Sequence, residues 1–155
     1  MTRWKRNCIL GLGVLLVGAQ FIPVVRSNPQ ITQDVSAPPE VRAVLKRSCY
    51  DCHSNETVWP WYSKVAPVSW LVISDVNEGR EHVNFSEWGT YDAQQKRHIL
   101  EEAWEEVEEG KMPMRIYTII HPHAVLSDAD KALIHGWVEG GLHSVKTAMS
   151  EGEKH

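Results

Sequence analysis

The sequence predicts an all-α fold in which one small helical domain follows an apolar N-terminal helix. Apolar residues recur at helical spacing in several segments, and no stretch alternates apolar and polar residues for long enough to require a sheet. The 155 residues suffice for one core of modest size but not for two independent ones. We therefore expect a single folded unit with an additional N-terminal segment.

The first 26 residues are typical of a targeting segment. Arg3, Lys5 and Arg6 precede an apolar run over residues 8–25, which would span about 27 Å as a helix, at the short end of what a bilayer requires. We expect residues 1–26 to be a signal anchor or a signal peptide. An uncleaved transmembrane anchor is favoured because no small-x-small cleavage site follows the run. The basic residues would stay cytoplasmic, which places the domain on the other side of the membrane.

The charge is distributed unevenly along the chain. The formal net charge is −4, and residues 1–26 contain four basic and no acidic residues, so a charge of −8 remains on the rest. An acidic domain of this kind does not favour nucleic acid as a partner, and we expect none.

The folded domain is predicted over residues 38–143, after a polar linker over residues 27–37 that shows no hydrophobic period. Pro38 and Pro39 suit the first turn of a helix. Side chains on one face of that helix are Val41, Val44, Leu45 and Cys49. The first helix therefore ends at a cysteine.

Three further helices are expected downstream, each with an apolar stripe and a stop signal. They cover residues 67–77 with Gly79 as the stop, residues 92–109 with Gly110 as the stop, and a segment from Ser127, capped with Asp130, to Gly140 and Gly141. Six glutamates cover the polar face of the helix over 92–109, which we expect to be a solvated surface. Residues 144–155 are small and polar, and they are predicted to form a flexible tail.

The strongest motif is Cys49-Tyr50-Asp51-Cys52-His53. Two cysteines separated by two residues can each form a thioether to a haem vinyl group, and the histidine that follows can ligate the iron. We expect Cys49 and Cys52 to hold one haem c covalently, with His53 as the proximal iron ligand. The predicted export agrees with this, because covalent haem attachment normally takes place outside the cytoplasm.

Two other uses of the cysteines are less consistent with the sequence. A zinc site needs two more ligands, but there is no second Cys-x-x-Cys, and the pair His121 and His123 lacks the spacing of a zinc finger. A redox dithiol follows a strand and begins a helix, whereas here a helix ends at Cys49. We therefore favour haem over both.

The sixth iron ligand remains open among three side chains. The run from Glu109 to Met114 places two thioethers in a tight turn, and a methionine sulfur raises the reduction potential relative to a second imidazole. Met112 is the first choice as distal ligand, because a proline follows it directly. Met114 and His121 are the alternatives, and an open site is a further one.

Other histidines and several aromatic residues carry weaker signals. His82 and His98 lie in polar surroundings, and we expect both at the surface. Aromatic side chains soon after the motif can wall a haem or simply pack in the core, and these are Trp59, Trp61, Tyr62 and Trp70.

Six runs carry a resemblance to a known family. They are Leu45–Thr57, Trp59–Ser63, Ala66–Trp70, Asn77–Arg80, Phe85–Trp88 and Met112–Pro122. Over about residues 35–140 the chain resembles the bacterial haem-binding domain family, which is related to cytochrome c. The resemblance implies an exported, cytochrome c-like helical domain with one haem on Cys49 and Cys52 and with His53 as proximal ligand. With the N-terminal anchor, we expect this domain at the periplasmic face of a bacterial inner membrane. Many relatives have a proline or another apolar residue where this chain has Met114, which leaves the choice between the two sulfurs open.

These features predict an electron-transfer protein. We expect a membrane-anchored mono-haem c-type cytochrome that exchanges single electrons with a redox protein, since the sequence offers no catalytic constellation. The alternative is a haem sensor or a small peroxidase with an open or exchangeable sixth site. In that case His121 and His123 would be the polar groups near the iron.

Overall fold

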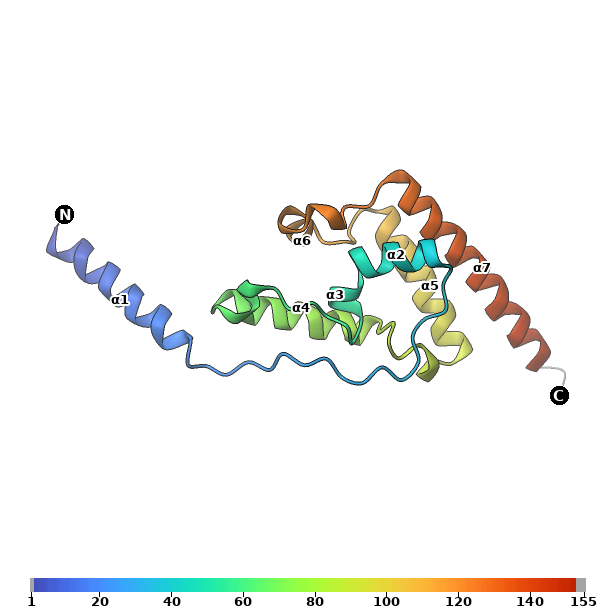
Figure 1. Cartoon of the computed structure of the whole chain (residues 1–155), viewed down its shortest axis with the longest axis horizontal. Helices are drawn as coiled ribbons and strands as arrows, with labels where there is room; N and C mark the ends of the chain where they lie inside the picture. Colours follow the sequence, from blue (N-terminus) through green and yellow to red (C-terminus); the bar gives the residue numbers. More distant parts are fainter. Residues whose placement is uncertain (1, 153–155) are drawn as a thin grey trace.

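The computed structural model describes residues 2–152, and its regular structure is helical (Figure 1). The α-helices are α1 (Arg3–Ala19), α2 (Pro39–Ser48), α3 (Tyr50–His53), α4 (Val68–His82), α5 (Ala93–Glu108), α6 (Arg115–Ile120) and α7 (Asp128–Gly152). Short 3₁₀ helices are η1 (Trp61–Lys64), η2 (Trp88–Thr90) and η3 (Pro122–Ala124). The predicted all-α class is confirmed.

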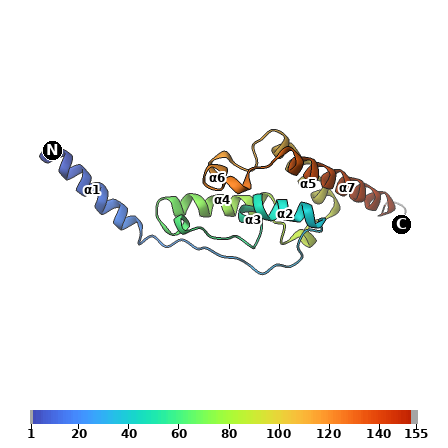
Figure 2. The ribbon, with the colours of Figure 1, turned by 45° about the horizontal axis from the view of Figure 1, so that its top comes forward.

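The domain is built on α5 and α7, which lie side by side and pack on α2, while α3 packs on α4 (Figures 1 and 2). The core forms two clusters of buried side chains. Val41 and Leu45 of α2 belong to the first cluster, with Phe85 and Ile99, whereas Val44 belongs to the second, with Leu100, Val107, Ile134 and Val138. Helix α2 therefore joins the two halves of the core and ends directly at the first cysteine.

The capping residues and the glycine stop from which α5 was predicted are found at the two ends of the helix. The Asp92 side chain accepts a hydrogen bond from the Gln95 backbone N–H, and the Gln95 side chain accepts one from the Asp92 N–H, so the capping box is complete. Beyond the helix, Gly110 has a φ of 71°, a left-handed conformation that glycine adopts without strain. Helix α5 therefore begins and ends within one residue of its predicted bounds.

Helix α7 is longer than predicted, because it continues through Gly140 and Gly141 to Gly152. A glycine inside a helix costs only about 1 kcal/mol relative to alanine, and packing can offset that cost. A Cβ at Gly141 would lie 2.8 Å from a methyl carbon of Leu100, so this glycine allows α7 to approach α5 closely. Residues 144–152, predicted as part of a flexible tail, are helical, and residues 153–155 lie outside the described residues.

The predicted transmembrane helix is wrong. Helix α1 has 17 residues and ends at Ala19, and residues 23–31 have no regular structure, so the apolar run over residues 8–25 does not form one continuous helix. Its first turns also carry Arg3, Lys5 and Arg6. Within residues 2–152 no helix combines the length and the apolar character needed to cross a membrane.

The segment predicted as a linker packs along the domain (Figure 1). The Val35 side chain is fully buried, and its N–H donates to the Phe85 carbonyl at 2.9 Å. Asp34 accepts hydrogen bonds from Arg42 at 2.7 Å and from the Tyr50 hydroxyl at 2.8 Å. The segment is therefore attached both to α2 and to the cysteine motif itself.

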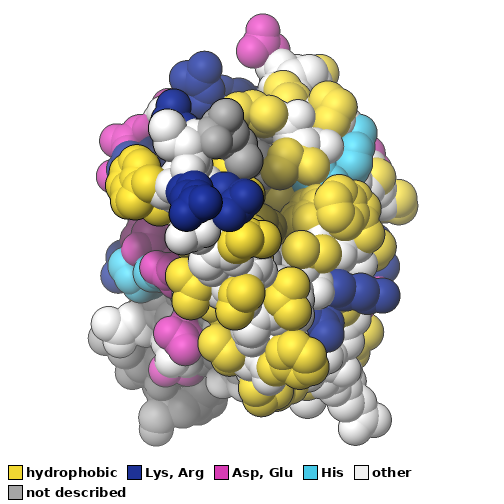
Figure 3. Space-filling view, turned by 90° about the vertical axis from the view of Figure 1, so that its left-hand side faces the viewer, with side chains coloured by type: hydrophobic (Ala, Val, Ile, Leu, Met, Phe, Trp, Pro, Cys, Tyr) yellow, Lys and Arg dark blue, Asp and Glu magenta, His cyan; other side chains and the backbone are white. Residues whose placement is uncertain are grey.

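Exposed hydrophobic side chains gather at the end of the molecule that carries α1 (Figure 3). Many belong to α1 itself, of which no residue is buried. Near the same end, Trp61 is 77% exposed and Ile119 of α6 is 71% exposed. The outer surface of α6 is therefore apolar.

We expect Val35→Ala to lower the free energy of unfolding by about 2 kcal/mol, because it removes two buried methyl groups and leaves a cavity. The matched control is Val58→Ala, since Val58 is 74% exposed, and it should leave stability unchanged. Urea denaturation measures both variants. Equal stability of Val35→Ala and the parent protein would show that residues 27–37 are a free linker after all.

Candidate functional site

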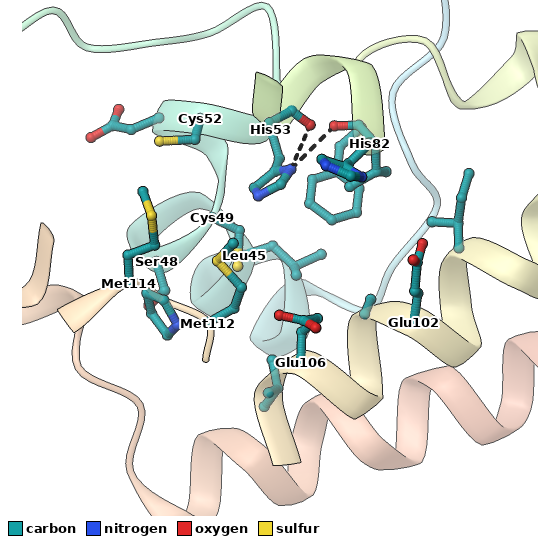
Figure 4. Close-up of a pocket in the computed structure, with 18 of the residues that line it drawn as sticks. Leu45, Ser48, Cys49, Cys52, His53, His82, Glu102, Glu106, Met112 and Met114 are labelled. Carbon is teal, nitrogen blue, oxygen red and sulfur yellow. Dashed lines mark hydrogen bonds between the residues drawn. The ribbon is translucent and has the colours of Figure 1, made fainter. Parts of the chain in front are cut away.

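The cysteine motif occupies a break between two helices. Helix α2 ends at Ser48, and Cys49 leaves helical geometry with φ −126° and ψ −37° before α3 begins at Tyr50. The His53 N–H donates to the Cys49 carbonyl at 2.9 Å, which closes one turn of helix. This turn directs Cys49, Cys52 and His53 toward one cavity (Figure 4).

That cavity has a volume of about 360 Å³, within the range typical of ligand pockets. Residues of helices α2 to α7 and of the segment 112–114 line it. Its apolar walls include Leu45, Val83, Phe85, Ile99, Val107, Ile134 and Trp137. The two core clusters thus leave a largely apolar space between them, with the motif at its edge.

The His53 ring is held in one orientation by backbone carbonyls of α4. Its Nδ1 lies 2.8 Å from the Gly79 oxygen and 3.3 Å from the Val83 oxygen, so Nδ1 carries the proton and donates. Burial lowers the pKa of His53, which favours the neutral imidazole. The second ring nitrogen, Nε2, therefore keeps a free lone pair, as a metal-ligating histidine requires.

Gly79 has a role that the sequence did not reveal. It was predicted to stop a helix, but α4 continues to His82, and Gly79 is a buried residue inside it. A Cβ at this position would lie 2.8 Å from the Cys52 carbonyl oxygen and 3.1 Å from the Cys52 Cβ. Only glycine lets α4 approach α3 closely enough for its carbonyl to reach His53.

The two motif cysteines are protonated thiols that form no disulfide. Burial, with Cys52 nearby, raises the pKa of Cys49 to about 12, and burial, with Asp51 nearby, raises the pKa of Cys52 to about 11. A catalytic dithiol needs the opposite shift, toward the thiolate. Among the described residues no group of three His, Cys, Asp or Glu side chains is arranged to hold a metal ion, so a zinc site has no support either.

Both candidate methionines reach the cavity. Met112 and Met114 line it together with Pro113, on the side across from His53 (Figure 4). The turn is attached to the end of α5, since the N–H groups of Lys111 and Met112 each donate to the Glu106 carbonyl at 3.0 Å. Two thioethers are thus available opposite the His53 imidazole.

His121 does not line the cavity. Its Nε2 lies 2.6 Å from the Tyr62 hydroxyl, and its ring stacks on Tyr117 with 4.4 Å between ring centroids. The Tyr117 hydroxyl in turn donates to the Asp51 carboxylate at 2.7 Å. His121 therefore helps to hold α6 beside the cysteine motif, and His123, against which its ring lies edge to face, is also outside the cavity.

Three polar residues of the cavity were not predicted from the sequence. His82 and Glu102 are exposed, as expected, and Glu106 is half-buried, but all three also line the cavity. Helical periodicity identified the apolar stripe of α5 but could not show which glutamates border it on the cavity side. The aromatic residues Trp59, Trp61, Tyr62 and Trp70 do not line the cavity.

Comparison with known proteins gave one match. The model of a protein family described as "Haem-binding domain" matches residues 14–140, which is most of the chain. No curated protein and no solved structure matches the chain.

We expect Gly79→Ala to lower the free energy of unfolding by about 1 to 3 kcal/mol, because the added methyl group overlaps the Cys52 backbone. Gly136→Ala is the matched control, since nothing lies within 4 Å of a Cβ in that helix, and it should stabilise by up to about 1 kcal/mol. Urea denaturation compares the two. If Gly79→Ala were as stable as the parent protein, the close approach of α4 to α3 would not be required.

Proposed function

Because the chain belongs to the haem-binding domain family, we propose that it is a mono-haem c-type cytochrome that transfers single electrons. The observation that supports this most strongly is the state of His53. Its Nδ1 is occupied by the Gly79 carbonyl, while Nε2 is free beside two protonated thiols. A histidine, two thiols and an apolar cavity are the groups that a covalently attached haem requires.

The residues fit the cofactor in detail. Cys49 and Cys52 would form the thioethers, and His53 would be the proximal iron ligand. The hydrogen bond from Nδ1 to Gly79 orients the ring and increases the basicity of Nε2. Bound in this cavity, the haem iron supplies a one-electron couple between its ferric and ferrous states.

We further propose Met112 as the sixth ligand. Its own backbone N–H and that of Lys111 donate to the Glu106 carbonyl, so the backbone of Met112 is more firmly held than that of Met114. Met114 also lines the cavity and is the alternative. Thioether ligation in an apolar cavity favours the ferrous state and raises the reduction potential relative to two imidazoles.

A location outside the cytoplasm, with a redox protein as partner, is part of the proposal. It rests on the cysteine motif, since thioether attachment of haem normally takes place after export. It does not require the N-terminal segment to cross a membrane.

The sensor or peroxidase alternative is less consistent with the geometry. Its candidate polar groups near the iron are His121 and His123. Both lie outside the cavity, and His121 is hydrogen-bonded to Tyr62.

The first test concerns covalent attachment. The full chain, expressed with a cytochrome c maturation system, should keep haem on a denaturing gel, and the double variant Cys49→Ala, Cys52→Ala should lose it. Cys8→Ala is the control, because Cys8 is exposed on α1 and should not affect staining. Haem that acidified acetone extracts from the parent protein would contradict the proposal.

The second test concerns the sixth ligand. Met112→Ala should convert a low-spin haem to a high-spin one that binds carbon monoxide, because the iron loses its thioether. Met114→Ala and His121→Ala should keep the low-spin absorption spectrum. A low-spin spectrum in all three variants would rule out every candidate ligand named here, and loss in Met114→Ala alone would assign the other sulfur.

A further inference from the structure

The cavity is poor in cations for a cofactor that carries two carboxylates. Among the residues that line it there is no lysine or arginine, whereas five are acidic: Asp51, Asp75, Glu78, Glu102 and Glu106. A haem propionate beside these carboxylates needs a hydrogen-bond donor, because an uncompensated charge close to like charges is costly. A side-chain donor among the lining residues would stabilise the propionate and fix its position.

Most donors that line the cavity already have partners. The Tyr117 hydroxyl donates to Asp51, the Trp137 indole N–H donates to the Ser36 carbonyl at 3.2 Å, and His53 Nδ1 donates to Gly79. Apart from the two thiols, Ser48 and His82 remain. The Ser48 hydroxyl is buried without a partner. The His82 ring is exposed, and it forms no hydrogen bond with the described part of the chain.

The positions of these two donors distinguish them. The vinyl groups and the propionates of haem stand on opposite edges of the macrocycle, so the cysteines fix which end of the cavity receives the propionates. Ser48 directly precedes Cys49 and lies at the attachment edge. His82 and Glu102 lie at the far side of the cavity from Cys52 and Met114 (Figure 4).

Helix α4 presents His82 to that edge. His82 is three residues after Gly79, so the two lie on the same face of the helix, and Gly79 contacts the motif. Glu102, the acidic residue at this end of the cavity, pairs with His98 of its own helix rather than with His82, and its carboxylate lies 3.7 Å from His98 Nε2. The His82 ring is thus free to turn toward a ligand.

We propose that His82 binds a haem propionate, donating an imidazole N–H to the carboxylate and so positioning the edge of the cofactor opposite the thioethers. This inference rests on the proposed covalent haem. It assigns a positioning role to a histidine that is not an iron ligand.

The test uses the purified holoprotein and its NMR spectrum. Nuclear Overhauser contacts should connect the His82 ring protons to a propionate methylene group. His82→Ala should shift the propionate methylene resonances and leave those of the two axial ligands in place. It should also lower the reduction potential, because the propionate charge is less compensated and the ferric state is favoured, and His82→Gln should restore part of the loss.

The matched control is His98→Ala, since His98 is exposed on α5 and does not line the cavity, and it should leave the potential unchanged. Contacts from His82 to the thioether edge, or a potential that His82→Ala does not alter, would overturn the inference. Both of these measurements are made on protein that carries covalently attached, low-spin haem. If haem staining fails instead, the proposed function is wrong, so the two failures are distinguishable.

Discussion

The contact between α4 and α3 at Gly79 is the constraint on which the site depends. The same residue allows the two helices to approach and supplies the carbonyl that fixes the His53 ring. Arg80, the next residue, extends this attachment, because its Nε donates to the Ser54 carbonyl at 2.8 Å and its Nη2 to the Thr57 hydroxyl at 2.9 Å. One turn of α4 thus determines both the direction of the imidazole and the path of the chain that leaves the motif.

Helix α2 and the segment before it hold the cysteine motif on the side away from α4. Helix α2 carries the first cysteine into place because its apolar face is shared between both core clusters. The segment before α2 adds a second attachment, since Asp34 contacts Arg42 of α2 and Tyr50 of α3. Stability and site geometry therefore depend on the same contacts, and a haem held by His53 would stabilise the elements that hold it.

Local chemistry decided what could be predicted. The ends of α5 were predictable because Asp92, Gln95 and Gly110 act within one turn of the helix. The cysteine motif and the two methionines were recognisable because their side chains have few alternative uses. The end of α7, the burial of Val35 and the position of His82 depend on packing between segments that are distant in sequence, which no local pattern records. The apolar run near the N-terminus was misread because hydropathy does not show that its helix ends at Ala19.

The hydrogen bond between Tyr117 and Asp51 has a mechanical consequence. Asp51 lies between the two cysteines, so this hydrogen bond attaches the segment that follows the methionines to the motif itself. A second hydrogen bond, between Tyr62 and His121, holds the end of α6. Moving α6 and the methionine turn away from the cavity would break both hydrogen bonds. A small molecule that enters the cavity from this side would therefore have to displace a segment held by the hydroxyl groups of Tyr117 and Tyr62.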